Sequence, residues 1–304
     1  MKKILSILFV LTLVSLTVEK EKTVYQTKNL IGKISVLEES TYFVNELGEK
    51  SKILMNLSIY KFDSLGVIFE ETIAPANGLG FKRIQYVNDP TGKPLQVEEY
   101  AKHGKLERKK TFKYDKNGNL IVAYVLKNDG KTIADKTVHK YDKKNNEIEF
   151  NKFGEDTTKM NGKSLNKYDG KNNLIESTIY IKDLKTPAGI AKYTYNNKGQ
   201  KITEKGYDFK GTIRKHFEFN YDADGNMIEL KSFKADGKTI LLWTKSKFDD
   251  KHNETETLYL NPDGTIQETN TYEFTYDQKG NWIKQKRSTN GGLNQIIERK
   301  ITYF

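Results

Sequence analysis

An aromatic residue followed by Asp or Asn recurs along most of this chain at intervals of about 27 residues. Self-similarity at a fixed period marks a repeat protein, in which each unit is one supersecondary element that buries its apolar side against its neighbours. This period limits the possible folds more strongly than any other feature of the 304 residues. The aromatic positions are Tyr114, Tyr141, Tyr168, Tyr195, Tyr221, Phe248, Tyr276 and Tyr303, with Phe62 and Tyr86 as weaker members.

The positions that follow each aromatic residue have the composition of a hairpin turn. The first is Asp or Asn, whose side chain caps a type I turn by accepting hydrogen bonds from backbone N–H groups. Three residues later the column contains only Gly, Asn and His, which suits a positive φ at the bulge position of a three-residue hairpin. An Asn or Gln comes next. We therefore assign a structural turn role to Asp115, Gly118, Asn119, Asp222, Gly225, Asn226, Asp277, Gly280 and Asn281, and the same geometry explains His252.

Between the turns the residues alternate between apolar and polar, for example in Ile213–Tyr221. A second turn signal, such as Asp236-Gly237, divides each unit into two strands. Alternation with one polar side predicts antiparallel strands that bury one face, and no helical period follows residue 18. The predicted fold is all-β: tandem antiparallel β-hairpin repeats of about 27 residues forming a long, strongly twisted or coiled β-meander. A flat sheet of this width would have to coil, spiral or close upon itself to cover its aromatic face.

Residues 1–18 have the pattern of a secretory signal peptide, with Lys2 and Lys3 before an apolar stretch. The cleavage site is mediocre, so an uncleaved anchor is the alternative. The chain has no Cys, which excludes disulfides, thiolate metal sites and a lipid-modified N-terminal Cys. We predict an exported bacterial protein that is periplasmic, extracellular or on the cell surface, is not a lipoprotein and has no transmembrane domain after signal removal. Degenerate β repeats or a cap at 19–85 then precede the array at 86–304.

The motifs YDKNGN at 114–119, YDADGN at 221–226 and YDQKGN at 276–281 resemble the YD repeats of the Rhs family. The resemblance covers residues 86–304 and implies a β-meander and export. Long arrays in that family wrap strands into hollow shells around toxin domains, and YD repeats have been linked with carbohydrate binding. Because this array is short and runs to Phe304, we expect a short array without a toxin domain.

The formal net charge is +11, or +9 without the two lysines of the signal peptide. A basic balance permits anionic partners such as acidic glycans, phospholipid headgroups or nucleic acid. The charge is spread over strands and turns, which is typical of lysines on solvated faces and edge strands. Export disfavours nucleic acid as a partner.

No motif for catalysis or metal binding stands out. The GK[ST] sequences lack the preceding Gly of a phosphate-binding loop, and hairpin turns explain them. The four His residues are not at metal-ligand spacing from one another. Asp222–Asn226 lacks the terminal Glu of a calcium loop. We therefore predict that the protein is not an enzyme, with no catalytic residue, no metal and no cofactor.

Aromatic residues on the strands are the remaining candidates for function, because aromatic faces can stack on sugar rings. The alternative is that these rings pack the coiled sheet or protect an edge. We predict a non-catalytic, exported binding or scaffold module for a cell-envelope or extracellular glycan. The alternative function is a periplasmic carrier or chaperone that holds an apolar ligand on a concave aromatic sheet face. The candidate ligand-binding residues are Trp243, Trp282, Tyr180 and Tyr207.

Overall fold

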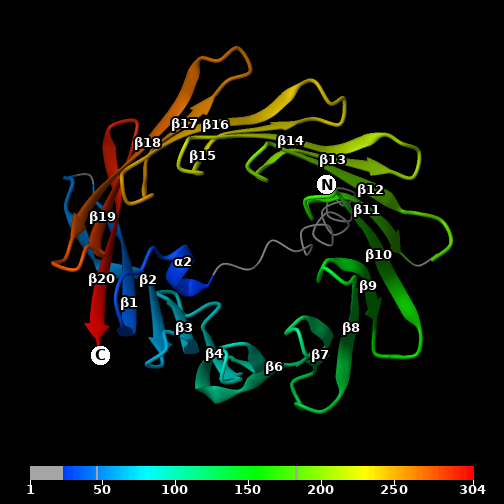
Figure 1. The fold of residues 1–304 in the computed structure, drawn as a ribbon. Coiled ribbons are helices and arrows are strands. Elements are labelled where there is room, and N and C mark those ends of the chain that lie inside the picture. The colour runs from blue at the N-terminus through cyan, green and yellow to red at the C-terminus, as the bar shows by residue number, and fades with distance from the viewer. Residues whose placement is uncertain (1–22, 46, 182–183) are drawn as a thin grey trace. The chain divides into compact units, whose positions relative to one another are not determined.

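The computed structural model describes residues 23–45, 47–181 and 184–304, so the predicted signal peptide lies outside the described residues. They form an all-β antiparallel meander of twenty strands (Figure 1). The strands are β1 (Ile34–Val44), β2 (Lys50–Phe62), β3 (Ile68–Pro75), β4 (Lys82–Asn88), β5 (Pro94–Tyr100), β6 (Leu106–Tyr114), β7 (Leu120–Leu126), β8 (Ile133–Tyr141), β9 (Glu147–Phe153), β10 (Met160–Tyr168), β11 (Leu174–Ile181), β12 (Gly189–Tyr195), β13 (Lys201–Asp208), β14 (Ile213–Tyr221), β15 (Met227–Phe233), β16 (Ile240–Phe248), β17 (Glu254–Leu260), β18 (Ile266–Tyr276), β19 (Trp282–Thr289) and β20 (Gly292–Tyr303).

The strands belong to two compact units. The described residues of unit 1 are 113–124, 133–181 and 184–243, and those of unit 2 are 23–45, 47–112, 125–132 and 244–304. In unit 1, β8 to β15 pair antiparallel in chain order. In unit 2, antiparallel pairing runs from β16 to β20, continues from β20 to β1, and then runs from β1 to β6. The predicted boundary between residues 85 and 86 stays a prediction.

The first and last strands of the described chain, β1 and β20, pair with each other. The β1–β20 ladder extends from Ile34 opposite Tyr303 to Phe43 opposite Gln295 (Figure 1). An open coil would leave the outer backbone groups of both strands unpaired, and such edges invite association with other chains. The prediction of a coiled meander is therefore wrong for β1 and β20, because the backbone groups along their edges bond to each other.

Among the described residues, two short helical segments interrupt the all-β pattern, although the sequence shows no helical period there. The helix α2 (Val24–Thr27) begins with a capping box, in which Thr23 and Gln26 exchange side-chain and backbone hydrogen bonds. A 3₁₀ turn, η2, covers Lys102–Gly104. Both are too short for a period of 3.6 residues to be recognised. Among the described residues, no helix is long and apolar enough to cross a membrane.

The repeat turns have the geometry that their composition predicts. In one turn, the Asp115 carboxylate accepts hydrogen bonds from the backbone N–H groups of Asn117 and Asn119, at 2.8 and 2.9 Å. Gly118 lies at φ 79° in that turn. The same column contains non-glycine residues at positive φ, and His252 at 60° is one of them. Turn chemistry therefore fixes where each hairpin reverses.

A β-bulge follows the repeat turns from the one after Tyr141 to the one after Tyr276. Tyr168 lies opposite Leu174 and Lys167 lies opposite Glu176, so Ile175 is an extra residue on β11. A bulge places two residues opposite one and increases the local twist. The repeated isoleucine column of the sequence thus consists of bulge residues, including Ile148, Ile175, Ile202, Ile228 and Ile283.

The repeat tyrosines connect each hairpin to the turn before it. In unit 1, the Tyr168 hydroxyl donates to the Glu147 carbonyl at 2.9 Å, and the Tyr195 hydroxyl donates to the Leu174 carbonyl at 2.8 Å. In unit 2, the Tyr303 hydroxyl donates instead to the Asp277 carboxylate at 2.5 Å. This link explains why an aromatic residue with a hydroxyl recurs at a fixed distance from the turn.

The two faces of the sheet differ in chemistry. We call the side that carries the repeat tyrosines the tyrosine face; its buried cluster in unit 1 includes Ala191 and Tyr193. We call the opposite side the ion-pair face, because cross-strand lysine–glutamate pairs recur on it, as between Lys167 and Glu176 at 2.7 Å. The lysine of this pair is 70% exposed, so the ion-pair face is wetted by solvent. In unit 2 the tyrosine-face core comprises Ile34, Leu37, Tyr60 and Phe62.

Candidate functional site

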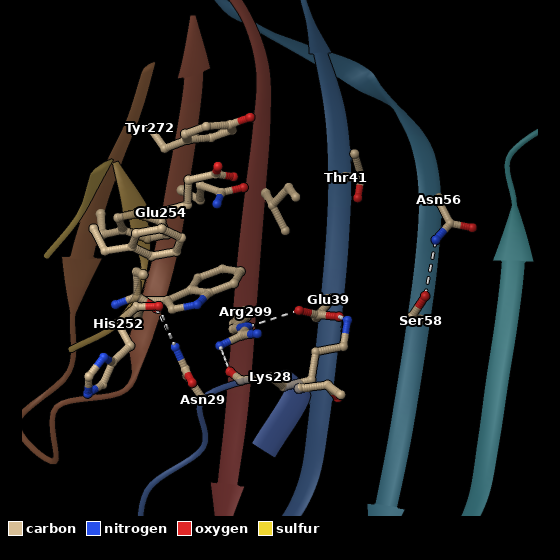
Figure 2. Close-up of a pocket in the computed structure, with 17 residues that line it drawn as sticks. Lys28, Asn29, Glu39, Thr41, Asn56, Ser58, His252, Glu254, Tyr272 and Arg299 are labelled. Atoms are coloured by element: carbon tan, nitrogen blue, oxygen red, sulfur yellow. Dashed lines mark hydrogen bonds and ion pairs between the residues drawn. The ribbon is translucent and has the colours of Figure 1, made fainter. Parts of the chain in front are cut away.

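A cavity of about 530 Å³ opens on the tyrosine face of unit 2 (Figure 2). Strands β1, β2, β18, β19 and β20 supply most of its walls. The end of β16 at Phe248, the turn that follows it, the start of β17 at Glu254, and the segment Thr27, Lys28 and Asn29 at the end of α2 supply the rest. The site therefore depends on the β1–β20 pairing, which brings the beginning and the end of the array together.

A buried charge cluster lies at this cavity. The Arg299 Nε donates to Glu39 Oε1 at 2.9 Å, and Nη1 donates to the Lys28 carbonyl at 3.0 Å. The Lys28 ammonium forms an ion pair with the same carboxylate. The side chains of Arg299 and Glu39 are only 2% and 10% exposed, so solvent screens their interaction poorly. Figure 2 shows Glu39 between the two cationic groups.

Burial and charge act in opposite directions on the two cations. Burial lowers the pKa of Arg299 to about 10, although attraction to Glu39 acts to raise it. Burial also acts to lower the pKa of Lys28, but the interactions with Glu39 and Tyr60 outweigh it, so that pKa is raised. The Glu39 carboxylate thus pairs with two cations. For Arg299, the more deeply buried of the two, this pairing offsets only part of the effect of burial.

The register of β20 explains why an arginine occupies this position. Every second residue before a repeat tyrosine lies on the tyrosine face, which places Arg299 there, four residues before Tyr303. The corresponding residues in two units of the array are Ser164 and Ala191. Across the β1–β20 ladder, Arg299 lies directly opposite Glu39. The long-range pairing therefore supplies the countercharge that a buried arginine requires.

The cavity has one aromatic wall and one polar wall. On the aromatic side, the rings of Phe274 and Trp282 lie with centroids 5.8 Å apart, and Tyr272 continues this wall. The Arg299 guanidinium lies over the Trp282 ring, 3.2 Å from its centroid. Rings in such a wall offer apolar faces with a negative quadrupole.

Hydroxyl and amide groups of β1 and β2 form the polar wall. Thr41, Asn56 and Ser58 line the cavity there, and the Asn56 amide donates to the Ser58 hydroxyl at 3.1 Å. Figure 2 shows these three residues on strands across from Tyr272. An amide and hydroxyls can donate to and accept from a polar ligand without adding net charge.

The segment around α2 is fixed to the sheet by specific bonds. The Tyr25 hydroxyl accepts from the Ile34 backbone N–H at 2.8 Å and donates to the Ile34 carbonyl at 3.1 Å. The Tyr25 ring packs edge-on against Phe62, with centroids 4.9 Å apart. These contacts of Tyr25 fix α2 to the sheet and so hold Lys28, the residue after the helix, at the cavity.

The turn asparagines hold the residues that follow α2. The Asn281 side chain accepts from the Ile31 N–H at 2.7 Å and donates to the Ile31 carbonyl at 2.8 Å. The Asn29 amide donates to Asn253 Oδ1 at 3.1 Å. A second cavity of about 450 Å³ lies along this segment, and Trp282 lines both cavities. Asn281, a predicted turn residue, thus also positions the N-terminal part of the site.

The four sequence-predicted ligand residues are divided between the two units. Trp282 lines the cavity and is 8% exposed. Trp243, Tyr180 and Tyr207 belong to unit 1 and lie on its ion-pair face. A lysine Nζ lies over each of these rings. The distances from Nζ to the ring centroid are 4.3 Å for Lys231 and Trp243, 4.6 Å for Lys163 and Tyr180, and 5.9 Å for Lys192 and Tyr207. A ligand role for each of the four stays a prediction.

Sequence reasoning missed Arg299, Glu39 and Lys28. One signal was available, because alternation back from Tyr303 places a charged residue on an otherwise uncharged stretch of the tyrosine face. Glu39 could not be paired with it in advance, since the two residues are 260 positions apart. Within the described ranges, no group of three or more His, Cys, Asp or Glu residues is placed to hold a metal ion.

No protein-family model matches this chain. No curated protein matches it either. Among solved structures, the chain is similar to a porin-like protein from Bacteroides uniformis, with 10% identity, 88% of this chain and 96% of that chain covered, and a TM-score of 0.32. A porin-like protein from Bacteroides vulgatus gives 11% identity, coverages of 90% and 99%, and a TM-score of 0.31. The TcdB2-TccC3 structure gives 11% identity, coverages of 86% and 19%, and a TM-score of 0.28. Similarity this weak does not assign the chain to a family.

Proposed function

We propose that this protein is a non-catalytic, exported binding module for a cell-envelope or extracellular glycan, and that the 530 Å³ cavity of unit 2 is its binding site. The observation that carries this proposal is the pairing of an aromatic wall with a wall of amide and hydroxyl groups. A sugar ring has an apolar face that stacks on aromatic side chains and a rim of hydroxyls that needs hydrogen-bonding partners.

The composition of the cavity favours this ligand over an apolar one. Asn56, Ser58 and Thr41 would lose hydrogen bonds to water against an aliphatic chain, and burying unpaired polar groups is costly. The charge cluster adds to that cost. A carrier of apolar ligands, the alternative predicted from the sequence, suits this cavity less well.

Binding to glycan arrays and isothermal titration calorimetry test the proposal. Tyr272→Ala removes part of the aromatic wall, and Asn56→Ala removes the amide of the polar wall. We expect each variant to bind a glycan found on the array about tenfold more weakly, a loss of roughly 1.4 kcal/mol. Tyr180→Ala and Tyr207→Ala are matched controls on the ion-pair face of unit 1 and leave affinity unchanged.

Two results count against the proposal. The first is an array on which neither neutral nor acidic glycans bind. The second is a glycan whose affinity falls in the Tyr180 and Tyr207 variants and not in the Tyr272 and Asn56 variants, which moves the site to unit 1. Displacement of a bound glycan by a fatty acid would instead favour the carrier.

A further inference from the structure

The Arg299 guanidinium is buried and yet incompletely bonded. Its two hydrogen bonds use Nε and Nη1, and a guanidinium carries more N–H donors than these. Within the part of the chain that the structure describes, Nη2 has no hydrogen-bond partner. The side chain is 2% exposed and lines the cavity, so water outside the cavity cannot satisfy these donors. Nη2 is not cut off from the cavity, so a ligand or a cavity water can accept its hydrogen bonds there.

The geometry leaves one edge of the guanidinium open to a ligand. The Trp282 ring covers one face of the guanidinium plane, with its centroid 3.2 Å from Arg299 Cζ, and Glu39 accepts the hydrogen bond from Nε. The edge formed by Nη1 and Nη2 remains. Two parallel N–H groups on one edge match the two oxygens of a carboxylate, and they also match two oxygens of a sulfate or phosphate ester.

The charged groups that contact Arg299 also favour an anionic ligand. Lys28 and Arg299 share the single carboxylate of Glu39. The other carboxylate that lines the cavity, Glu254, accepts a hydrogen bond from the Ser246 hydroxyl, and His252 and Tyr272 are the remaining titratable groups. The lowered pKa of Arg299 agrees with a cation whose burial exceeds its compensation. A negative charge on a ligand beside Arg299 would offset the remaining cost of burying this cation.

We propose that the glycan bound by unit 2 is acidic, and that an oxyanion substituent of the sugar binds the Nη1–Nη2 edge of Arg299, with Lys28 beside it. This inference rests on the proposed glycan-binding function. The substituent is a carboxylate, as in a uronic acid, or a sulfate or phosphate ester, since all three present paired oxygens. The basic net charge of the chain attracts such polymers at long range and raises their rate of encounter.

Calorimetry with three probes tests this inference. The probes are an oligosaccharide of galacturonic acid, the same oligosaccharide after reduction of its carboxyl groups to alcohols, and a sulfated oligosaccharide of similar length. We expect the wild-type protein to bind at least one acidic probe more than tenfold more tightly than the reduced one. Preference between the uronate and the sulfated probe identifies the substituent.

Variants at the charge cluster assign the effect to Arg299. Arg299→Met alone leaves Glu39 without its deepest partner, so the double variant Arg299→Met/Glu39→Gln removes one positive and one negative charge and leaves the net charge of the cavity unchanged. We expect this variant and Lys28→Met to lose the preference for the acidic probe over the reduced probe, which is read from the ratio of the two dissociation constants. Arg214→Met is the matched control, because Arg214 is a 50% exposed arginine of unit 1 paired with Asp208. It removes the same charge and retains the preference.

The outcomes separate this inference from the proposed function. Equal affinity for the acidic and reduced probes overturns the inference and leaves glycan binding intact. Loss of the preference in Arg214→Met to the same extent overturns it too, because attraction then comes from net charge alone. Absence of binding by all three probes and by the glycan array overturns the proposed function itself.

Discussion

Removing the charge of Glu39 is expected to destabilise unit 2 strongly. The change Glu39→Gln keeps the size of the side chain and leaves Arg299 and Lys28 without a countercharge. Because the Arg299 side chain is 2% exposed and that of Glu39 is 10% exposed, the pair lies in the buried regime, where loss of one partner costs about 3–5 kcal/mol. A domain has only about 5–15 kcal/mol of stability in total.

An exposed pair in unit 1 provides the matched control. Glu176→Gln removes a carboxylate that pairs with Lys167, whose side chain is 70% exposed. Such surface pairs contribute about 0–1 kcal/mol. The difference between the two glutamate variants therefore measures the effect of burial, since both changes are chemically identical.

Urea unfolding followed by tryptophan fluorescence measures this difference. The chain has two tryptophans, Trp243 and Trp282. In a Trp243→Phe background the emission reports on Trp282, which lies against the Arg299 guanidinium. The double variant Glu39→Gln/Arg299→Met should recover most of the lost stability. A loss below about 1 kcal/mol in Glu39→Gln, or no recovery in the double variant, would refute the assignment of a buried, mutually dependent pair.

Three further predictions concern the repeat itself. Tyr168→Phe removes the hydroxyl that donates to the Glu147 carbonyl and should lower the unfolding free energy by about 0.5–1.5 kcal/mol, measured by urea unfolding; no change would mean that this link between hairpins is not needed. Gly225→Ala places a Cβ at φ 92° and 3.3 Å from the Gln200 amide, and should cost about 1–2 kcal/mol, whereas Gly170→Ala meets no atom within 4 Å and should cost less. Hydrogen bonds from the hydroxyls of the neighbouring threonines lower the pKa of Asp129 and of Asp236 from 3.8 to about 2. Because each folded-state pKa lies below the unfolded value, these groups stabilise the fold above about pH 4, and their contribution is lost as the pH falls from about 4 through 2. The Asp129→Asn/Asp236→Asn variant should therefore show a shallower loss of stability over that range, and an unchanged pH dependence would contradict this reading.

The hairpin repeat was predictable because its signals are local. Asp115 and Gly118 determine the turn through bonds and backbone angles that involve only nearby residues. The alternation of strand residues likewise needs no long-range information. The bulge at Ile175 was harder to foresee, because the sequence shows a conspicuous column but not which residue of the opposite strand is skipped.

The pairing of the array's ends and the candidate site were not predictable in the same way. The β1–β20 ladder joins strands from opposite ends of the chain, and no local pattern specifies it. The contact of Arg299 with Glu39 and the docking of Ile31 on Asn281 both follow from that ladder and from the path of the N-terminal segment. Trp282 was identified from its residue type, but the residues that form a cavity with it come from strands far apart in the sequence.

The central claim, that glycans bind in the cavity of unit 2, is tested most directly by site-resolved fluorescence titration. Trp282 lines the cavity, whereas Trp243 lies in unit 1 and donates to Glu229 at 2.6 Å. Titrating the galacturonic acid oligosaccharide into the Trp243→Phe protein should produce a saturable change in Trp282 emission, with the same dissociation constant as calorimetry. The Trp282→Phe protein, which reports on Trp243, should show no change on titration. A response from Trp243 alone, or calorimetric binding with a silent Trp282, would contradict the account.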